Sequence, residues 1–166
     1  FYAENAGVIL AEGTKASFNG NGYYALAGSV MRLSSGETQS NNNGNGYSSV
    51  EGSVVIAGNS WAQANSGTGY YASYDSLLYM TSAHSLDNQG KGAYAYNSSI
   101  FAGGAELVGN VEQGAYALYM SMLYLDSATV DSNGPDGEVS GVELGHNSFA
   151  YLENATVSNN RGWGVA

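Results

Sequence analysis

Two carboxylates are the residues of this sequence best placed to catalyse hydrolysis of a glycosidic bond. Asp126 and Glu153 occupy equivalent places in successive segments that share one residue pattern. If the segments stack as neighbouring strands, the carboxylates lie about 5 Å apart, as in the acid–nucleophile pair of a retaining glycosidase. Two acidic side chains also come to lie one above the other on an ordinary solvated acidic surface. Because Gly104 and Thr81 hold this place in the preceding segments, no cleft wall is indicated, and we favour the surface interpretation over a catalytic one.

A second acidic group lies in an insertion. Asp131, Asn133, Asp136 and Glu138 place oxygen atoms at nearby positions around a Gly-Pro turn, which is a ligand type that Ca²⁺ prefers. The spacing is not that of an EF-hand, and acidic loops of this kind are common without metal. We therefore predict no cofactor, with calcium as the alternative.

The cationic residues complete no catalytic set. Arg32 and Arg161, like His84 and His146, lie far apart in the sequence and at different places in its pattern, so no nucleophile–base–acid group converges on any of them. We expect the chain not to be an enzyme, with a polysaccharide lyase or a glycosidase as the alternative.

Tyrosine, with 14 residues, is the most informative residue type. Two sets recur at fixed places in the pattern, and we predict them as binding residues: Tyr2, Tyr24, Tyr71, Tyr94 and Tyr116, and Tyr79, Tyr124 and Tyr151. Aromatic rows can simply stabilise a sheet through cross-strand contacts. They can also form a flat surface for sugars or for a neighbouring fibre.

All these residues belong to an internal repeat. The chain divides after glycines into seven coils of 22 to 27 residues, and two further residues open an eighth. The coils are 1–22, 23–46, 47–69, 70–92, 93–114, 115–141 and 142–164.

Aligned coils share columns. The third column is small, for example Ala25, Ala72 and Ala117. The seventh is Gly7 followed by serines: Ser29, Ser53, Ser76, Ser99, Ser121 and Ser148. The eighth is apolar: Val8, Val30, Val54, Leu77, Ile100, Met122 and Phe149. The eleventh is Ala11, Leu33, Ala57, Met80, Gly103, Leu125 and Leu152. Near the end of each coil comes an asparagine: Asn19, Asn41, Asn65, Asn88, Asn110, Asn133 and Asn160.

This pattern predicts short strands joined by turns. Alternation with period two, broken by Gly, Asn and Ser, is typical of strands, and stacked coils pair each strand with its own copy. Asparagines can then extend amide hydrogen bonds along the stack, and glycines suit turn positions that need positive φ. By alternation, the tyrosines of the second column point outward. The eighth column points outward as well, unless a bulge intervenes, and such an apolar stripe would be an interface.

The serine–apolar core of each coil, the asparagine row and the closing Gly-x-Gly resemble the pectin-lyase-like right-handed β-helix superfamily, which includes adhesin passengers and phage tailspikes. The resemblance covers essentially the whole chain and implies an all-β, right-handed parallel β-helix (β-solenoid) of about seven coils over residues 1–166. It says little about activity, because that fold hosts lyases, hydrolases and inert fibres.

Composition excludes some partners. The net charge is −10 with four Lys and Arg residues, so phosphates of a nucleic acid could not be neutralised. No apolar run reaches the length of a membrane span, and no cysteine provides disulfides or thiolate ligands.

We therefore expect a structural segment of an extracellular or cell-surface fibre, filament or adhesin, or of a virion fibre. The alternative is a carbohydrate-binding or carbohydrate-cleaving domain. Because the sequence starts at Phe1 and shows no capping segment, we expect a piece of a longer chain or a filament subunit. Its partners would be copies of itself, packed head-to-tail or laterally, and glycans in the alternative case.

Overall fold

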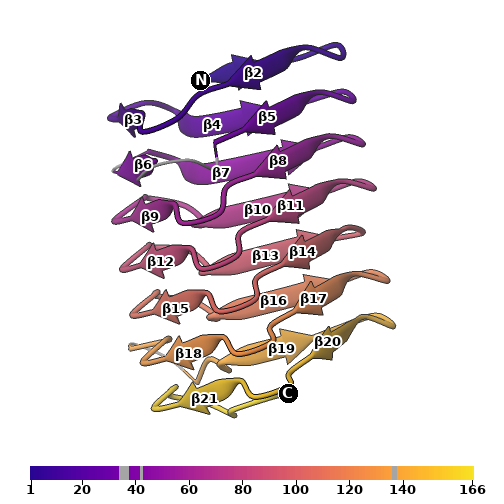
Figure 1. Ribbon diagram of the computed structural model, residues 1–166. Coiled ribbons are helices and arrows are strands. Elements are labelled where there is room, and N and C mark those ends of the chain that lie inside the picture. Colours follow the sequence, from indigo (N-terminus) through magenta and orange to yellow (C-terminus); the bar gives the residue numbers. More distant parts are fainter. Residues whose placement is uncertain (34–37, 42, 136–137) are drawn as a thin grey trace.

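The computed structural model describes residues 1–33, 38–41, 43–135 and 138–166. In this part of the chain there is no helix, and each coil contributes three short strands to three parallel sheets (Figure 1). The strands stack coil upon coil from the N-terminus at the top of the view to the C-terminus at the bottom. The predicted fold class is confirmed: the chain is an all-β parallel β-helix of about seven coils.

The three sheets run the length of the stack. Sheet A contains β1 (Tyr2–Ala3), β4 (Asn21–Ala25), β7 (Asn45–Val50), β10 (Tyr70–Ser73), β13 (Ala93–Tyr96), β16 (Ala115–Leu118) and β19 (Val142–Leu144). Sheet B contains β2 (Val8–Leu10), β5 (Val30–Arg32), β8 (Val54–Ile56), β11 (Leu77–Tyr79), β14 (Ser99–Phe101), β17 (Met122–Tyr124) and β20 (Phe149–Tyr151). Sheet C contains β3 (Lys15–Ser17), β6 (Gln39–Asn41), β9 (Trp61–Gln63), β12 (His84–Leu86), β15 (Glu106–Val108), β18 (Thr129–Asp131) and β21 (Thr156–Ser158).

Strand pairing joins each residue to its equivalent in the next coil. Tyr71 pairs with Tyr94, and Tyr94 with Tyr116. Backbone hydrogen bonds also link the turns, as from Tyr47 N–H to the Gly69 carbonyl at 2.9 Å. Because the side chains of a strand alternate between its faces, one column of the sequence becomes one row on one face.

Coil five departs from the predicted alignment by one residue. At the corner between sheets A and B, coil four has two residues with positive φ, Tyr74 and Asp75, whereas coil five has Asn97 there. The shorter corner brings Ser98 into the serine row and pairs Ile100 with Leu78 in the core.

Three column assignments in coil five were therefore wrong. The serine row contains Ser98 instead of Ser99, and Ser99 takes the outward place that was assigned to Ile100. Ala102 takes the buried place that was assigned to Gly103, since its N–H bonds to the Tyr124 carbonyl.

The core holds a stack of tyrosines in the upper coils. Tyr23, Tyr47 and Tyr70 are fully buried, and their rings lie nearly parallel with centroids 4.8 Å apart. Each hydroxyl is satisfied; that of Tyr47 donates to the Thr38 carbonyl at 2.8 Å. Burial raises the pKa of Tyr47 and of Tyr70, so both stay neutral.

Large and small core residues alternate between sheets A and C. Where sheet A supplies Tyr47, sheet C supplies Ala62 in the same coil; where sheet A supplies Ala93, sheet C supplies Leu107. The same exchange continues with Ala115 beside Val130 in coil six. Protein interiors are packed to a constant density. A large side chain from sheet A is therefore matched by a small one from sheet C, and a large one from sheet C by a small one from sheet A.

An asparagine ladder closes every coil at the turn from sheet C to sheet A. Asn88 Nδ2 donates to Asn110 Oδ1 at 2.9 Å and to the Ala62 carbonyl at 3.0 Å, while Asn88 Oδ1 accepts from Asn65 N–H and Nδ2 at 3.0 and 2.8 Å. The member from coil two is Asn43, not the predicted Asn41, because Asn43 N–H donates to Asn65 Oδ1.

The asparagine ladder also explains the closing glycines. A Cβ on Gly69 would lie 2.1 Å from Ser85 Oγ and 2.8 Å from the Gly92 carbonyl, so the turn has no room for a side chain. The expectation that these glycines serve positive φ was wrong. Most positive-φ positions are taken by other residues, including Asn59 and Asp87, types that tolerate the left-handed region.

We predict that Asn88→Leu lowers the free energy of unfolding by about 2–4 kcal/mol, because the buried N–H of Asn65 and the carbonyl of Ala62 lose their partners. Urea denaturation followed by circular dichroism measures the change. Asn19→Leu, at the exposed end of the same column, is the matched control and should cost less than about 1 kcal/mol. Equal losses for both variants would contradict a buried ladder.

The exchange between sheets A and C predicts a rescue. Tyr47→Ala should cost about 3–5 kcal/mol, because it empties a fully buried site. Adding Ala62→Leu recreates the combination of coil five and should recover part of that loss. In the wild-type background Ala62→Leu alone should destabilise by overpacking. Additive losses in the double variant, measured by thermal unfolding, would refute the exchange.

Candidate interaction surface

The outer face of sheet B is the most unusual surface of the molecule. Alternation turns the first and third residue of each strand outward and buries the middle one, as in β11, where Leu78 is fully buried and Leu77 and Tyr79 are not. The outer face consists of Val8, Leu10, Val30, Arg32, Val54, Ile56, Leu77, Tyr79, Ser99, Phe101, Met122, Tyr124, Phe149 and Tyr151.

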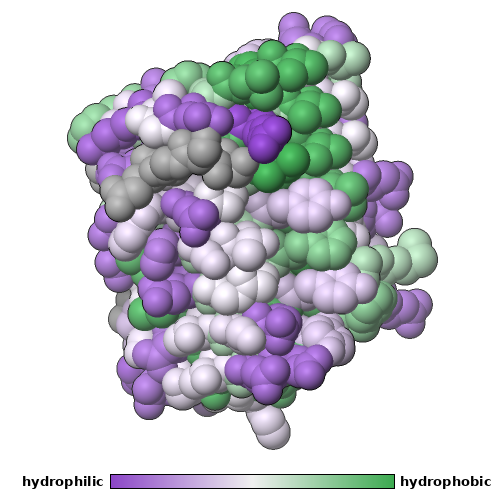
Figure 2. Space-filling model, in the orientation of Figure 1, coloured by the Kyte–Doolittle hydropathy of each residue, from purple (hydrophilic) through white to green (hydrophobic). Residues whose placement is uncertain are grey.

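This face is apolar although it is open to solvent. Val8 is 66% exposed and Leu10 73% exposed. Figure 2 shows the face as a green hydrophobic band at the upper right, which continues downward as paler aromatic rings. Among the described residues no segment lies over it. Soluble surfaces seldom carry a continuous apolar strip of this length unless it binds something.

The charge of the molecule lies elsewhere. The net charge is −10, yet none of the outward residues of sheet B is acidic, and Arg32 is the one charged residue among them. Sheet C carries the opposite character on its outer face, with Lys15, Glu106 and Asp131. Desolvating the face of sheet B therefore removes few charges from water, which keeps the cost of binding there low.

The lower half of this face is an aromatic ladder. The rings of Tyr79 and Phe101 stack with centroids 4.8 Å apart, and those of Phe101 and Tyr124 stack at 4.9 Å. The rings of Tyr124 and Tyr151 are tilted, with centroids 6.0 Å apart. The prediction that the three tyrosines share one row is confirmed by their register, and the structure places this row on the outer face. Phe101 was missed because coil five is one residue short, and counting from Ser98 instead of Ser99 would have found it.

The other predicted tyrosines lie on sheet A. Tyr71 and Tyr94 have ring centroids 5.4 Å apart, and Tyr94 and Tyr116 5.3 Å apart. Lys91 Nζ lies 5.3 Å from the centroid of Tyr94 and pairs with Glu112. Burial, assisted by the neighbouring phenols, raises the pKa of Tyr94 to about 12. The row points outward as predicted, but it does not join the row on sheet B, because the two lie on different sheets.

The tyrosine row of sheet A is broken at coil three. Ser48 stands in register between Tyr24 and Tyr71 and is fully buried. Its hydroxyl, like that of the nearby buried Ser73, has no hydrogen-bond partner among the described residues. Such a group normally binds water, so a buried hydroxyl interrupts the aromatic row at coil three.

The two candidate carboxylates lie at the exposed turn after sheet B. Asp126 accepts a hydrogen bond from Ser127 Oγ at 3.2 Å, and Glu153 accepts one from the Tyr151 hydroxyl. They belong to adjacent coils, since Ser127 N–H donates to the Glu153 carbonyl at 2.8 Å. Neither lines a principal depression of the surface, so no wall holds a substrate against them.

The candidate calcium residues do not converge in the described part of the chain. The side chain of Asn133 is a buried member of the asparagine ladder, with Oδ1 accepting from Asn110. Asp131 instead accepts from Ser132, Ser158 and Asn159, which lowers the pKa of its carboxyl group. Glu138 lines a shallow depression with Arg161, and Asp136 lies outside the described residues. No cluster of three or more acidic, His or Cys side chains occurs among those described.

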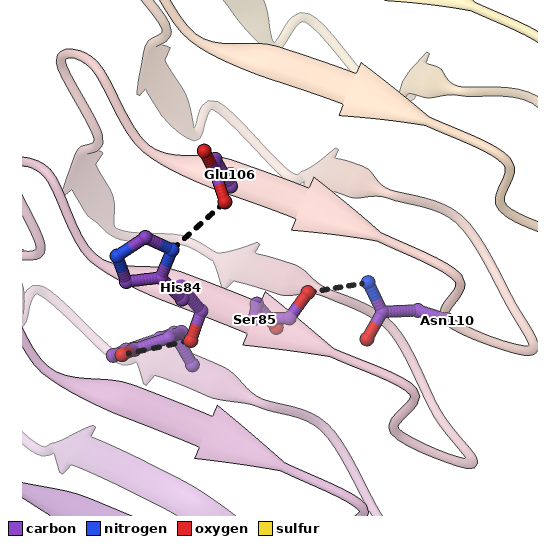
Figure 3. Close-up of polar contacts among 5 residues, drawn as sticks. His84, Ser85, Glu106 and Asn110 are labelled. Atoms are coloured by element: carbon purple, nitrogen blue, oxygen red, sulfur yellow. Dashed lines mark hydrogen bonds and ion pairs between the residues drawn. The ribbon is translucent and has the colours of Figure 1, made fainter.

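Sheet C presents ordinary polar contacts. His84 stacks on Trp61 with centroids 4.0 Å apart, and its Nδ1 lies 2.9 Å from Glu106 Oε2. Figure 3 shows this contact on the outer face, while the carbonyl of the next residue, Ser85, accepts from Asn110 on the inner side. His84 and His146 lie on different faces, and His146 stacks on Tyr119 at 4.5 Å. The histidines therefore contribute to aromatic packing.

No protein-family model matches the sequence, and no curated protein matches it. In the described residues no helix is long and apolar enough to cross a membrane. The structure shows a parallel β-solenoid, and no superfamily is assigned to it.

Neighbouring residues of β11 test which face is open. We predict that Leu77→Asn changes the free energy of unfolding by less than about 1 kcal/mol, because its side chain points outward. Leu78→Asn places an amide in the core and should cost about 3 kcal/mol or more. Chemical denaturation of both variants decides the matter. If Leu77→Asn lowered the free energy of unfolding as much as Leu78→Asn does, the outer face of sheet B would be covered rather than open to solvent.

Proposed function

We propose that this chain is a structural β-solenoid segment of an extracellular fibre, filament or adhesin, and that the outer face of sheet B is its protein-contact surface. The observation that carries the proposal is the apolar strip from Val8 to Tyr151, which is open to solvent and free of acidic side chains. The placement outside the cell rests on the likeness of the repeat to adhesin passengers and tailspikes.

The rest of the molecule supports a scaffold. Its core is continuous along the stack, and its asparagine and serine rows tie every coil to the next, as in the bond from Ser53 N–H to Ser76 Oγ at 3.2 Å. The candidate carboxylates Asp126 and Glu153 lie on an open turn. A stiff rod with a passive face needs no catalytic group, so we propose that the chain is not an enzyme and needs no cofactor.

Self-association is the expected activity. The net charge of −10 makes copies repel each other, so association should strengthen as salt screens that repulsion. Sedimentation at rising protein concentration, at physiological and at high salt, measures it. We expect Ile56→Glu and Phe101→Glu to reduce association strongly, because each buries a charge in the contact. Gln63→Glu on sheet C is the matched control and should change little.

A monomer that stays monomeric at high concentration and high salt would refute a self-contacting rod. So would equal effects of the substitutions on sheets B and C, because association would then not depend on the apolar face. Head-to-tail packing is a further way in which copies could assemble, and it would be insensitive to both sets of substitutions.

One observation favours a second candidate function, carbohydrate binding on sheet A. Tyr24 and Tyr71 flank the buried hydroxyl of Ser48, which has no hydrogen-bond partner among the described residues, and a row of outward aromatic rings suits the stacking of a sugar. A glycan panel tests it, together with an assay for release of reducing sugars. Binding that is lost in Tyr71→Ala and kept in Tyr79→Ala would support this candidate. We expect neither binding nor turnover.

A further inference from the structure

We propose that the outer face of sheet B docks against the same face of a second copy, with the two rods antiparallel and related by a two-fold axis beside coil four. This inference rests on the proposed contact function of that face, and it adds the partner and the orientation. It follows from how side-chain size changes along the face.

The face of sheet B has a size gradient. Apart from Arg32 in coil two, coils one to three carry aliphatic side chains, among them Val8, Val54 and Ile56. From coil four onward the third residue of each strand is aromatic, and in coil seven the first residue is aromatic as well: Tyr79, Phe101, Tyr124, Tyr151 and Phe149. The surface therefore rises from a low aliphatic end to a high aromatic end.

The gradient selects one of the two ways in which identical faces can meet. A two-fold axis along the rod makes the copies parallel and sets each coil against itself, so that bulky residues meet bulky residues and leave a gap at the other end. A two-fold axis along the strands makes the copies antiparallel. Val8 then faces Phe149, Leu10 faces Tyr151 and Ile56 faces Phe101, so that the aliphatic coils of one copy meet the aromatic coils of the other and the spacing is more even. Close packing favours the second arrangement.

The antiparallel arrangement also brings apolar residues together at the centre of the contact. Coil four faces its own copy across the axis, so Leu77 meets Leu77 and Tyr79 meets Tyr79, apolar on apolar. Coil two faces coil six, which puts Val30 opposite Met122. A second copy is the occupant that fits, because its strands repeat with the same spacing of about 4.8 Å and its ridges match this face along the whole length.

The area predicts a weak contact. Seven strands make a face about 34 Å long, and three residues per strand make it about 10 Å wide. Both copies together then bury about 700 Å², less than the roughly 1,600 Å² of a standard stable interface. Pairing of this segment should therefore need high protein concentration, and it would strengthen with each additional coil in register.

Thiol cross-linking tests the orientation cleanly, because the sequence contains no cysteine. We would make Val30→Cys and Met122→Cys as separate proteins, both at outward positions. Each would be treated with a short bis-thiol cross-linker, alone and as an equal mixture. The antiparallel dimer predicts that the mixture gives several-fold more covalent dimer than either protein alone. Parallel pairing predicts dimer from each protein alone, which would overturn the orientation.

The matched control uses the same two coils on sheet C. Gln39→Cys and Thr129→Cys stand on coils two and six with intermediate exposure, and their mixture should give collision-level dimer. Equal yields on sheets B and C, or no dimer from the first mixture when sedimentation shows association, would refute docking through sheet B. The second result leaves the proposed scaffold function standing, whereas absence of association in sedimentation would remove that function as well.

The central residue gives an independent check. In the proteins of the first mixture, Leu77→Lys sets two positive charges against each other across the axis and should reduce the dimer yield several-fold, whereas Leu77→Met should keep it. Circular dichroism confirms that each variant is folded. An unchanged yield with Leu77→Lys would show that coil four is not at the centre of the contact.

Discussion

The structure depends on hydrogen bonding between coils in strict register. Each strand bonds to its copy one coil away, as Tyr70 pairs with Tyr47 on one side and Ala93 on the other. The spacing between strands is set by the peptide hydrogen bond, so every side chain has its equivalents directly above and below. Rows of like residues are the direct result, and they give the molecule its buried ladders and its faces.

Inside the stack, this constraint favours residues that can hydrogen-bond to, or stack on, the equivalent residue of the next coil. Asparagine offers both a donor and an acceptor, so Asn65, Asn88 and Asn110 form a chain in which each carboxamide is donor to one neighbour and acceptor to the other. A buried amide without such a neighbour would lose its hydrogen bonds with water. The tyrosine stack uses ring packing in the same way and satisfies each hydroxyl at a backbone carbonyl or side chain.

Outside the stack, the same constraint arranges the outward residues of each sheet in continuous rows. Sheet C collects polar groups such as His84 and Glu106, whereas sheet B collects aliphatic and aromatic ones such as Val54 and Phe101. A face of this kind grows with the number of coils, and a partner with the same repeat can match it along its whole length. Interaction through a repetitive face therefore suits a solenoid better than recognition by a single pocket.

The sequence alone determined the repeat, the strand character and the outward direction of the tyrosine row on sheet A, because these depend on local alternation and on a period that survives small changes in coil length. It could not place coil five. The number of residues at a corner depends on whether one or two adopt positive φ there, and Asn97 does alone what Tyr74 and Asp75 do together.

Only the tertiary structure decided the pairing of large and small core residues, since Tyr47 and Ala62 belong to different sheets and meet only when the coil closes. It also separated the two tyrosine rows onto different faces and directed Asn133 into the ladder rather than toward the acidic loop. Local patterns set which way a side chain points from its strand, whereas closure of the coil sets what it meets there.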